Sequence, residues 1–258
     1  MRSRSDVVIV GGGIIGSSIG YALAKEGLSV TVLERDSIGN HASGFALGLL
    51  NPTNDIGITE SLVHQAFRMH QSQLEQVQEE SGVDAQVQTL PHLELALEES
   101  EITVLKSEVD RINSLPNFKA TWLEPNEIKK LEPRLTEQLH GGVLVEDVII
   151  LDSYNLTLAT AQAAEMRGAK FILKEATGIV YESNRANAVM MGEDRIDCDV
   201  VVLALGPWSG ASSLWLDIDI PIVPQKGEIV RVEGLEPSLG IHVHGSPLGH
   251  SCSVVQKS

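Results

Sequence analysis

The segment Val7-Val-Ile-Val-Gly-Gly-Gly-Ile-Ile-Gly16 decides the fold of this chain. Asp6–Val10 is a short run rich in β-branched residues, which is typical of a buried strand. A glycine turn follows, and the residues after it predict a helix to about Glu26. Ser29–Leu33 predicts a second strand that ends at Glu34. A strand, a helix and a strand so close together predict a right-handed crossover between parallel neighbours.

The glycines of this segment satisfy the pattern G-x-G-x-x-G at the point where a strand gives way to a helix. Gly11 allows a tight turn, Gly13 lets a pyrophosphate approach the backbone, and Gly16 lets the helix pack closely on the strand. Glu34 lies at the end of the second strand, where a carboxylate accepts hydrogen bonds from a ribose. The pattern predicts a dinucleotide site, but it serves NAD and FAD alike.

The composition is that of an ordinary globular protein: 258 residues, 43% of them hydrophobic and 21% charged. The formal net charge of −16 argues against a nucleic-acid-binding protein. Cys198 and Cys252 stand far apart, in no metal-ligand spacing, so we expect neither a disulfide framework nor a structural zinc site. A cytoplasmic location is the corresponding expectation.

A membrane alternative arises at the N-terminus, because Val7–Ala24 carries no charge and follows Arg2 and Arg4. Such a run resembles a signal peptide or an anchor. Five glycines within it make a poor membrane helix, and the dinucleotide motif explains their spacing. We therefore expect no transmembrane segment.

The remaining chain alternates helical and strand patterns. Val200–Leu205 is continuously apolar and predicts a central strand buried on both faces, and Gly227–Val232 predicts a further strand. The other expected elements are helices at 59–81, from Ile102 to about Ile112, and from an N-cap at Asp152 or Ser153 to about Arg167, and strands around Leu93–Leu97 and at Lys170–Leu173, Gly178–Glu182 and Ala188–Met191.

Several segments resemble the FAD-dependent D-amino-acid oxidase superfamily, and within it the glycine oxidase and sarcosine oxidase branch. The resemblance runs through nearly all of residues 6–258 and is most specific in the first 50. It rests on Asp6–Ser17, Val32-Leu-Glu-Arg35, Ala42-Ser-Gly-Phe-Ala-Leu-Gly-Leu-Leu50, Val201-Val-Leu-Ala-Leu-Gly-Pro-Trp-Ser209 and Pro224-Gln-Lys-Gly227.

This resemblance implies an α/β fold with a Rossmann-like FAD-binding domain of the GR2 type. That domain is expected at residues 1–83 and 146–215, interleaved with an α+β substrate or cap domain at 84–145 and 216–258. The family carries its substrate-binding arginine and a further flavin-facing stretch late in the chain, and neither has a counterpart here. We therefore expect an incomplete cap domain, an N-terminal fragment of an oxidase-type protein, and poor FAD binding by these residues alone.

The resemblance also implies the cofactor contacts, and it implies that FAD is held noncovalently, since His41 matches no attachment pattern. No catalytic side chain is assigned. The residues expected to contact FAD are Gly11, Gly13, Ile14, Ile15, Gly16, Glu34, Arg35, Ala42, Ser43, Leu47, Gly48, Leu49, Thr177, Ala204 and Gly206.

The implied activity is oxidation of the CH–N bond of a small amine or amino acid such as glycine, sarcosine or a D-amino acid. Hydride passes to flavin N5, water hydrolyses the imine, and oxygen or a quinone takes the electrons. The full-length protein is expected to form a homo-oligomer. Two alternatives remain: a non-catalytic dinucleotide-binding chain, and an NAD(P)-dependent dehydrogenase.

A metal site is the remaining candidate, because His242, His244, His250 and Cys252 are good ligand types on or near one predicted strand. Their spacing matches no structural zinc module, and Gly245-Ser-Pro247 interrupts the element. We expect no metal, and we expect His242 and His244 to lie on an exposed strand and loop.

Overall fold

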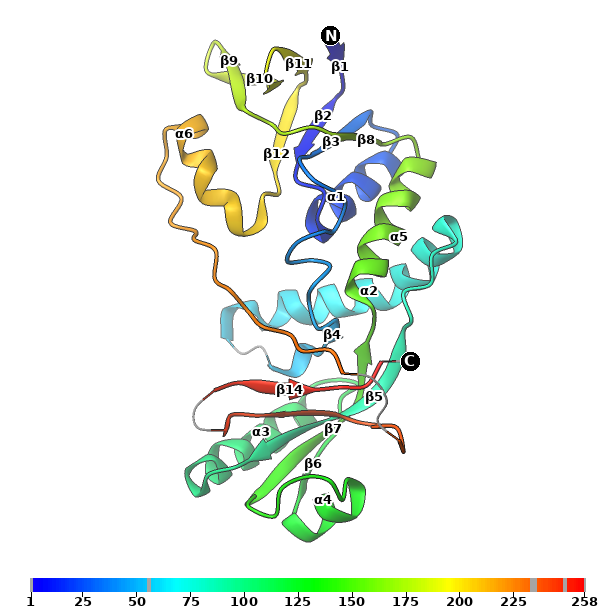
Figure 1. The fold of residues 1–258 in the computed structure, drawn as a ribbon, viewed down its shortest axis with the longest axis vertical. Coiled ribbons are helices and arrows are strands. Elements are labelled where there is room, and N and C mark those ends of the chain that lie inside the picture. The colour runs from blue at the N-terminus through cyan, green and yellow to red at the C-terminus, as the bar shows by residue number, and fades with distance from the viewer. Residues whose placement is uncertain (1, 55–56, 233–235, 248–249, 258) are drawn as a thin grey trace. The chain divides into compact units, whose positions relative to one another are not determined.

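The computed structural model describes residues 2–54, 57–232, 236–247 and 250–257 (Figure 1). The chain forms two compact units. Unit 1 comprises Met1–Leu47, His70–Ala85 and Asp152–Val230, and unit 2 comprises Gly48–Met69, Gln86–Leu151 and Arg231–Ser258. The units differ from the expected domains chiefly at 48–69 and 216–230, and their assignment to cofactor and substrate stays a prediction.

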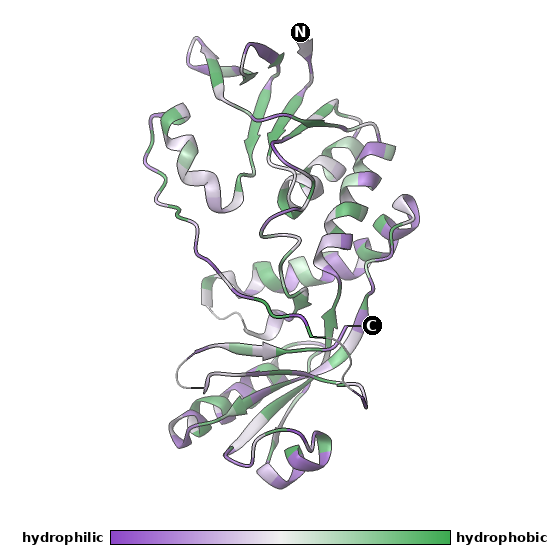
Figure 2. Ribbon diagram, viewed as in Figure 1, coloured by the Kyte–Doolittle hydropathy of each residue, from purple (hydrophilic) through white to green (hydrophobic). Residues whose placement is uncertain are grey.

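Unit 1 is built on a parallel sheet of strand order β12-β2-β3-β8. The expected strand–helix–strand unit is confirmed: β2 and β3 are parallel neighbours with Val7 opposite Val30. Figure 2 shows β2 and β12 as hydrophobic, and helix α1 packs against β2, β3 and α5. The bounds are β2 (Val7–Val10), α1 (Ile14–Lys25), β3 (Val30–Glu34), α5 (Ser153–Met166), β8 (Lys170–Leu173) and β12 (Val200–Leu203).

A second sheet of unit 1 has the order β1-β11-β10-β9. Its buried residues Val189 and Ile196 share an apolar core with Val8 and Leu33 of the parallel sheet. The bounds are β1 (Arg2–Arg4), β9 (Gly178–Glu182), β10 (Arg185–Met191) and β11 (Asp194–Asp197), followed later by the 3₁₀ helix η4 (Gly206–Ser212) and by α6 (Ser213–Leu216).

Unit 2 contains a mainly antiparallel sheet in the order β14-β13-β5-β7-β4, with β6 also paired to β7. Its apolar core gathers Leu93, Ile128 and Val243 from three different elements. The bounds are β4 (Leu49–Leu50), β5 (Gln88–Ala96), α3 (Ile102–Ser114), β6 (Ala120–Leu123), α4 (Pro125–Leu131), β7 (Gly141–Ile150), β13 (His242–Gly245) and β14 (Cys252–Val254). Two 3₁₀ turns, η1 (Pro52–Asn54) and η2 (Gly57–Thr59), lead into the helix α2 (Glu60–Ser81), and η3 (Glu99–Glu101) leads into α3.

Two strand predictions are wrong. β12 lies at the edge of its sheet in the described part of the chain, paired to β2, and Val200 is 50% exposed. Gly227–Val232 forms no strand, and Val230 is 84% exposed there. An apolar run shows that a segment suits a sheet, but a strand also needs a neighbour for its N–H and C=O groups.

No helix in the described ranges has both the length and the apolar character that crossing a membrane requires. The uncharged run Val7–Ala24 instead divides into β2, the glycine turn and most of α1.

The glycine turn brings three backbone segments of unit 1 into very close approach. Gly11 has φ +114°, a conformation that side chains disfavour, and a Cβ there would lie 2.2 Å from the carbonyl oxygen of Ala204. A Cβ on Gly16 would lie 1.9 Å from the carbonyl oxygen of Gly11. The end of β2, the first turn of α1 and the end of β12 therefore meet with no room for a methyl group.

Gly16→Ala is expected to lower the free energy of unfolding by about 3 kcal/mol, because backbone rather than a flexible side chain must move. Urea unfolding followed by circular dichroism measures the change. Gly178→Ala is the matched control: a Cβ at Gly178 meets nothing within 4 Å, so the loss should stay within about 0.5 kcal/mol. Equal losses in the two variants would contradict this account of the packing.

A charged cluster ties three helical segments of unit 1 together around Glu80. Its carboxylate accepts hydrogen bonds from Arg167 Nη2, from Arg167 Nε at 3.0 Å and from the Tyr21 hydroxyl at 3.2 Å. Hydrogen bonding to Arg167 lowers the pKa of Glu80 from 4.5 to about 2. The Glu80 side chain is 18% exposed, but that of Arg167 is 41% exposed, so solvent weakens the pair.

Glu80→Gln is expected to lower the free energy of unfolding at pH 7 by about 1 kcal/mol. Because the folded-state pKa of Glu80 is depressed, its stabilisation is complete above pH 4.5 and is lost as the pH falls towards about 2. The difference between wild type and variant, measured by urea unfolding, should therefore be constant from pH 7 to 5 and shrink below pH 4.5. Glu79→Gln, at the exposed neighbouring position, should change neither the free energy of unfolding at pH 7 nor its dependence on pH.

Candidate functional site

A cavity of about 390 Å³ opens at the carboxyl ends of the parallel strands of unit 1. Val10, Leu33 and Leu203, at or next to the ends of β2, β3 and β12, all line it. β2 lies between β3 and β12, so the chain leaves β2 in one direction and reaches β12 from the other. In open α/β sheets, ligands bind at this kind of switch point.

Glu34 is held at the end of β3 by two backbone groups. Its Oε2 accepts a hydrogen bond from the N–H of Gly12 at 2.8 Å, and its Oε1 accepts one from the N–H of Asp36 at 3.0 Å. Each carboxylate oxygen has a second acceptor position. The carboxylate is thus fixed in orientation and keeps acceptor capacity for hydroxyl groups in the cavity.

The beginning of α1 faces the same cavity and carries no acidic residue in its first turn. Its N-cap residue, Gly13, has no side chain to cap the helix, and Ser43 supplies the missing acceptor from the loop after β3. The N–H of Ile14 donates to Ser43 Oγ at 3.0 Å. A helix N-terminus with small residues around it suits an anionic group such as a phosphate.

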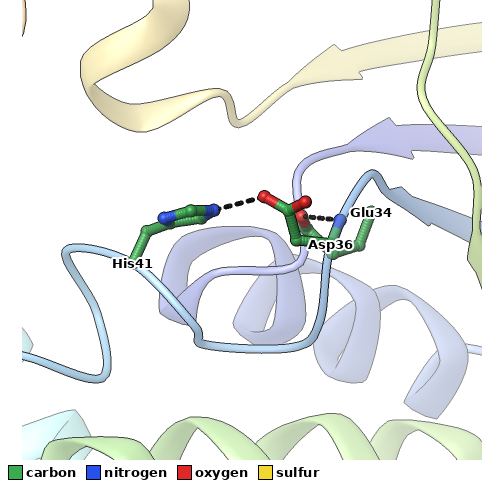
Figure 3. Close-up of side chains that lie close together, drawn as sticks. All are labelled: Glu34, Asp36 and His41. Atoms are coloured by element: carbon green, nitrogen blue, oxygen red, sulfur yellow. Dashed lines mark hydrogen bonds and ion pairs between the residues drawn. The ribbon is translucent and has the colours of Figure 1, made fainter.

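Arg35, His41 and Trp208 form another part of the cavity wall. The Arg35 guanidinium lies 4.4 Å from the centroid of a Trp208 ring, and the His41 and Trp208 ring centroids are 4.7 Å apart. His41 Nε2 and Asp36 Oδ2 are 2.6 Å apart (Figure 3). The hydrogen bond from His41 holds the pKa of Asp36 below its usual value.

Glu34, Asp36 and His41 lie close enough together to be considered as metal ligands, with one candidate atom of each within 4.8 Å of the others (Figure 3). Their internal bonds account for the arrangement: Glu34 accepts two backbone N–H groups and Asp36 pairs with His41. Exposed acidic groups gather in this way without a metal, so we assign no metal here.

The cavity brings together most of the residues expected to contact FAD. Some expected residues do not line it. Ile14 and Gly16 lie in the first turns of α1, and Leu47 belongs to unit 1. Gly48 and Leu49 belong to unit 2. The expected residues that line it are Gly11, Gly13, Ile15, Glu34, Arg35, Ala42, Ser43, Ala204 and Gly206.

Thr177 follows Ala176, which lines the cavity. Its backbone N–H donates to the carbonyl oxygen of Met190 at 2.8 Å, and its Oγ1 accepts from the N–H of Gly192 at 3.0 Å. The N–H is therefore engaged within the chain, and a backbone contact to an adenine would use the carbonyl group.

Trp208 and His41 were not identified from the sequence as parts of this wall, nor was Asp36 identified as the partner of His41. The motif Gly206-Pro-Trp-Ser209 was a signal for Trp208, since it follows β12 directly. No local pattern places His41 against Trp208, because their contact joins two loops that are far apart in the sequence.

The chain is similar to known proteins over nearly its whole length. Residues 6–255 match the family described as FAD dependent oxidoreductase (DAO). Glycine oxidase of Bacillus licheniformis is 29% identical over 237 residues, which cover 90% of this chain and 62% of that protein. Glycine oxidase of Geobacillus kaustophilus is 28% identical over 264 residues and is covered to 68%.

Solved structures show the same fold. The crystal structure of glycine oxidase from Geobacillus kaustophilus superposes with a TM-score of 0.83 at 24% identity, covering 99% of this chain and 69% of that one. Glycine oxidase from Bacillus cereus gives a TM-score of 0.76 at 28% identity over 83% of this chain and 58% of that one. The chain thus spans about three fifths to two thirds of the length of these relatives. Since the family match extends over nearly the whole chain, from the glycine turn to β14, the protein belongs to the FAD dependent oxidoreductase family.

Proposed function

We propose that this chain takes part in FAD-dependent oxidation of the CH–N bond of a small amine or amino acid, with glycine, sarcosine and D-amino acids as the first candidates. The observation that carries the proposal is the glycine turn of unit 1. It lines a cavity together with Glu34, whose carboxylate is held by the N–H of Gly12. The relatives named glycine oxidase support the substrate class.

The residues of the cavity fit the adenosine diphosphate half of FAD. At Gly11 and Gly16 a Cβ would collide with backbone, and at Gly13 it would lie 2.9 Å from Ser43 Oγ, so side chains are excluded along the turn. The N-terminus of α1 would hold the pyrophosphate, and Glu34 would accept the ribose hydroxyl groups. Ala204 and Gly206 would close the opposite side without bulk.

Bound FAD would supply an acceptor at flavin N5 for the hydride that leaves the substrate Cα. This chain's own residues would bind and orient rather than transfer protons. The ring of Trp208, held by Arg35 on one side and His41 on another, would keep water from that part of the cavity. The chemistry asks for no protein base if the amine is presented with its lone pair free.

A non-catalytic dinucleotide-binding chain is the second candidate. A relative of 22% identity, covering 81% of this chain, is the mitochondrial regulatory subunit of pyruvate dehydrogenase phosphatase of Mus musculus. That protein's name describes regulation rather than oxidation. This supports the second candidate, in which a chain of this kind binds a dinucleotide without catalysing oxidation.

Flavin reduction separates these candidates. FAD is added to the chain in excess, because we expect its affinity for these residues alone to be low, and binding is followed by flavin fluorescence with NAD as the comparison ligand. Under anaerobic conditions, glycine, sarcosine, D-proline or D-alanine is expected to bleach the flavin absorbance. Bound flavin that resists every amine would favour the non-catalytic candidate, and binding of NAD without FAD would overturn the cofactor assignment.

Glu34→Gln is expected to weaken binding of ADP, a probe for the adenosine half of the site, by about tenfold or more. The variant loses the charge that strengthens hydrogen bonds to the ribose hydroxyl groups. Isothermal titration calorimetry measures the dissociation constant. Glu26→Gln, at an exposed position just after α1, is the matched control and should bind ADP as wild type does; similar ADP affinity in Glu34→Gln and wild type would contradict the role of Glu34.

A further inference from the structure

A buried polar cluster lies where β5 and β13 pair in unit 2, and none of its residues lines the cavity described above. His92 and Glu94 lie on β5, His242 and His244 lie on β13, and Ser251 directly precedes β14. His92 is 1% exposed and His242 is fully buried. The expectation of an exposed strand for His242 is therefore wrong, because pairing with β5 covers this part of β13.

The side chains form one continuous chain of contacts. His92 Nδ1 and His242 Nδ1 are 2.6 Å apart, and the two rings are stacked with centroids 4.8 Å apart. Glu94 Oε2 lies 3.5 Å from His92 Nε2 and 2.6 Å from His244 Nδ1. His244 Nε2 lies 2.9 Å from Ser251 Oγ. The chain thus runs from a buried imidazole to an exposed hydroxyl.

One assignment of the ring protons satisfies these contacts. Ionised Glu94 only accepts, so in this assignment His92 carries its proton on Nε2, towards Glu94, and keeps a bare Nδ1. A contact between two Nδ1 atoms needs one donor and one acceptor, so His242 then donates from Nδ1 to His92. His242 Nε2 is left as a bare nitrogen, and it has no hydrogen-bond partner among the described residues.

This cluster makes up most of the pairing between β13 and β5. The two strands are in register at three positions, His92 with His242, Leu93 with Val243, and Glu94 with His244. β14 pairs with β13 and not with β5, so its attachment to the sheet passes through β13. We propose that His242, paired with His92, is a pH-sensitive joint, and that protonation of the His242 imidazole loosens the β13–β14 hairpin from β5.

The physical reason is the burial of an unpaired charge. A proton added to Nε2 of His242 gives a charged imidazole whose new N–H has no acceptor among the described residues. This costs free energy that release of the hairpin to water would recover.

Apart from Glu94 of the cluster itself, the described residues opposite these positions on the neighbouring strands bring no charged side chain. On β7, Val145 is opposite His92 and Val143 is opposite Glu94. On β14, Ser253 is opposite His244, and the exposed thiol of Cys252 is opposite Gly245.

Burial lowers the pKa of His242 to about 4; His92 and His244 act in the same direction, and Glu94 opposes them. A released His242 would return to its ordinary value of 6.5. The released hairpin therefore binds more protons between about pH 6.5 and pH 4, and attachment weakens as the pH falls through this window.

Apolar packing acts against release. Val243 of β13 and the preceding Leu239 and Ile241 belong to the same buried cluster as Leu93 of β5. Protonation is thus expected to shift the opening equilibrium of the hairpin gradually with pH. The rest of the sheet is expected to stay in place. One linked proton changes that equilibrium by up to tenfold per pH unit.

Hydrogen exchange of the full chain, corrected for the intrinsic rate at each pH, tests the proposal. The opening equilibrium for backbone amides of β13 and β14 is expected to rise by about tenfold per pH unit between pH 6 and 4.5, while that of β2 and β3 in unit 1 stays constant. A hairpin whose protection does not change over this range would overturn the joint.

His242→Gln removes the titrating group and keeps a polar side chain of similar length, so the pH dependence should disappear. His140→Gln, an exposed histidine of the same unit, is the matched control and should keep it. If His242→Gln does not fold, NMR titration of the wild-type imidazoles decides. His242 titrating near its ordinary value while the hairpin stays protected would refute the proposal, as would an unchanged slope in a folded His242→Gln.

Discussion

The contact between the backbone at Gly16 and the carbonyl oxygen of Gly11 is the constraint on which unit 1 depends. With no side chain at either position, the first turn of α1 lies directly against the end of β2, and Gly11 in turn lies against Ala204 after β12. This arrangement aligns two strand ends and one helix start around the same space. The cavity, the fixed carboxylate of Glu34 and the position of the N-terminus of α1 beside the cavity all follow from it.

The loop after β3 adds specificity to this frame without adding regular structure. Ser43 reaches back to Ile14 and caps α1, while Arg35 and His41 approach Trp208 from the same loop. A segment with no regular pattern in the sequence is thus held in place by contacts both to α1 and to Trp208. Such loops on a rigid sheet are where binding residues of α/β proteins are concentrated.

The elements that were predictable from the sequence are those whose structure is determined by residues close together in the chain. The glycine spacing placed the turn before α1, and Asp152 or Ser153 was predicted as a helix cap; the cap is Asp152. In the structure its Oδ1 accepts a hydrogen bond from the N–H of Asn155 at 2.8 Å at the start of α5. The errors concern features set by distant partners: the edge position of β12, the missing strand at Gly227–Val232 and the burial of His242.

The same distinction holds for the candidate site. Glycines and Glu34 were identifiable because their spacing along the chain encodes their geometry. Trp208 and the pair of Asp36 and His41 were not, because a ring contact between two loops has no periodic signature. The proposed FAD contacts of Leu47, Gly48 and Leu49 rest on family resemblance, since none of these residues lines the cavity of unit 1.

The long separation between pairing partners has a consequence for how this protein is made. Arg4 meets Asp199 across 195 residues, and His92 meets His242 across 150. Closing such loops costs entropy before any contact repays it. A nascent chain would carry β2 and β5 without β12 and β13 until residues 200–245 have been made, so its apolar strands would need shielding from other chains up to that point.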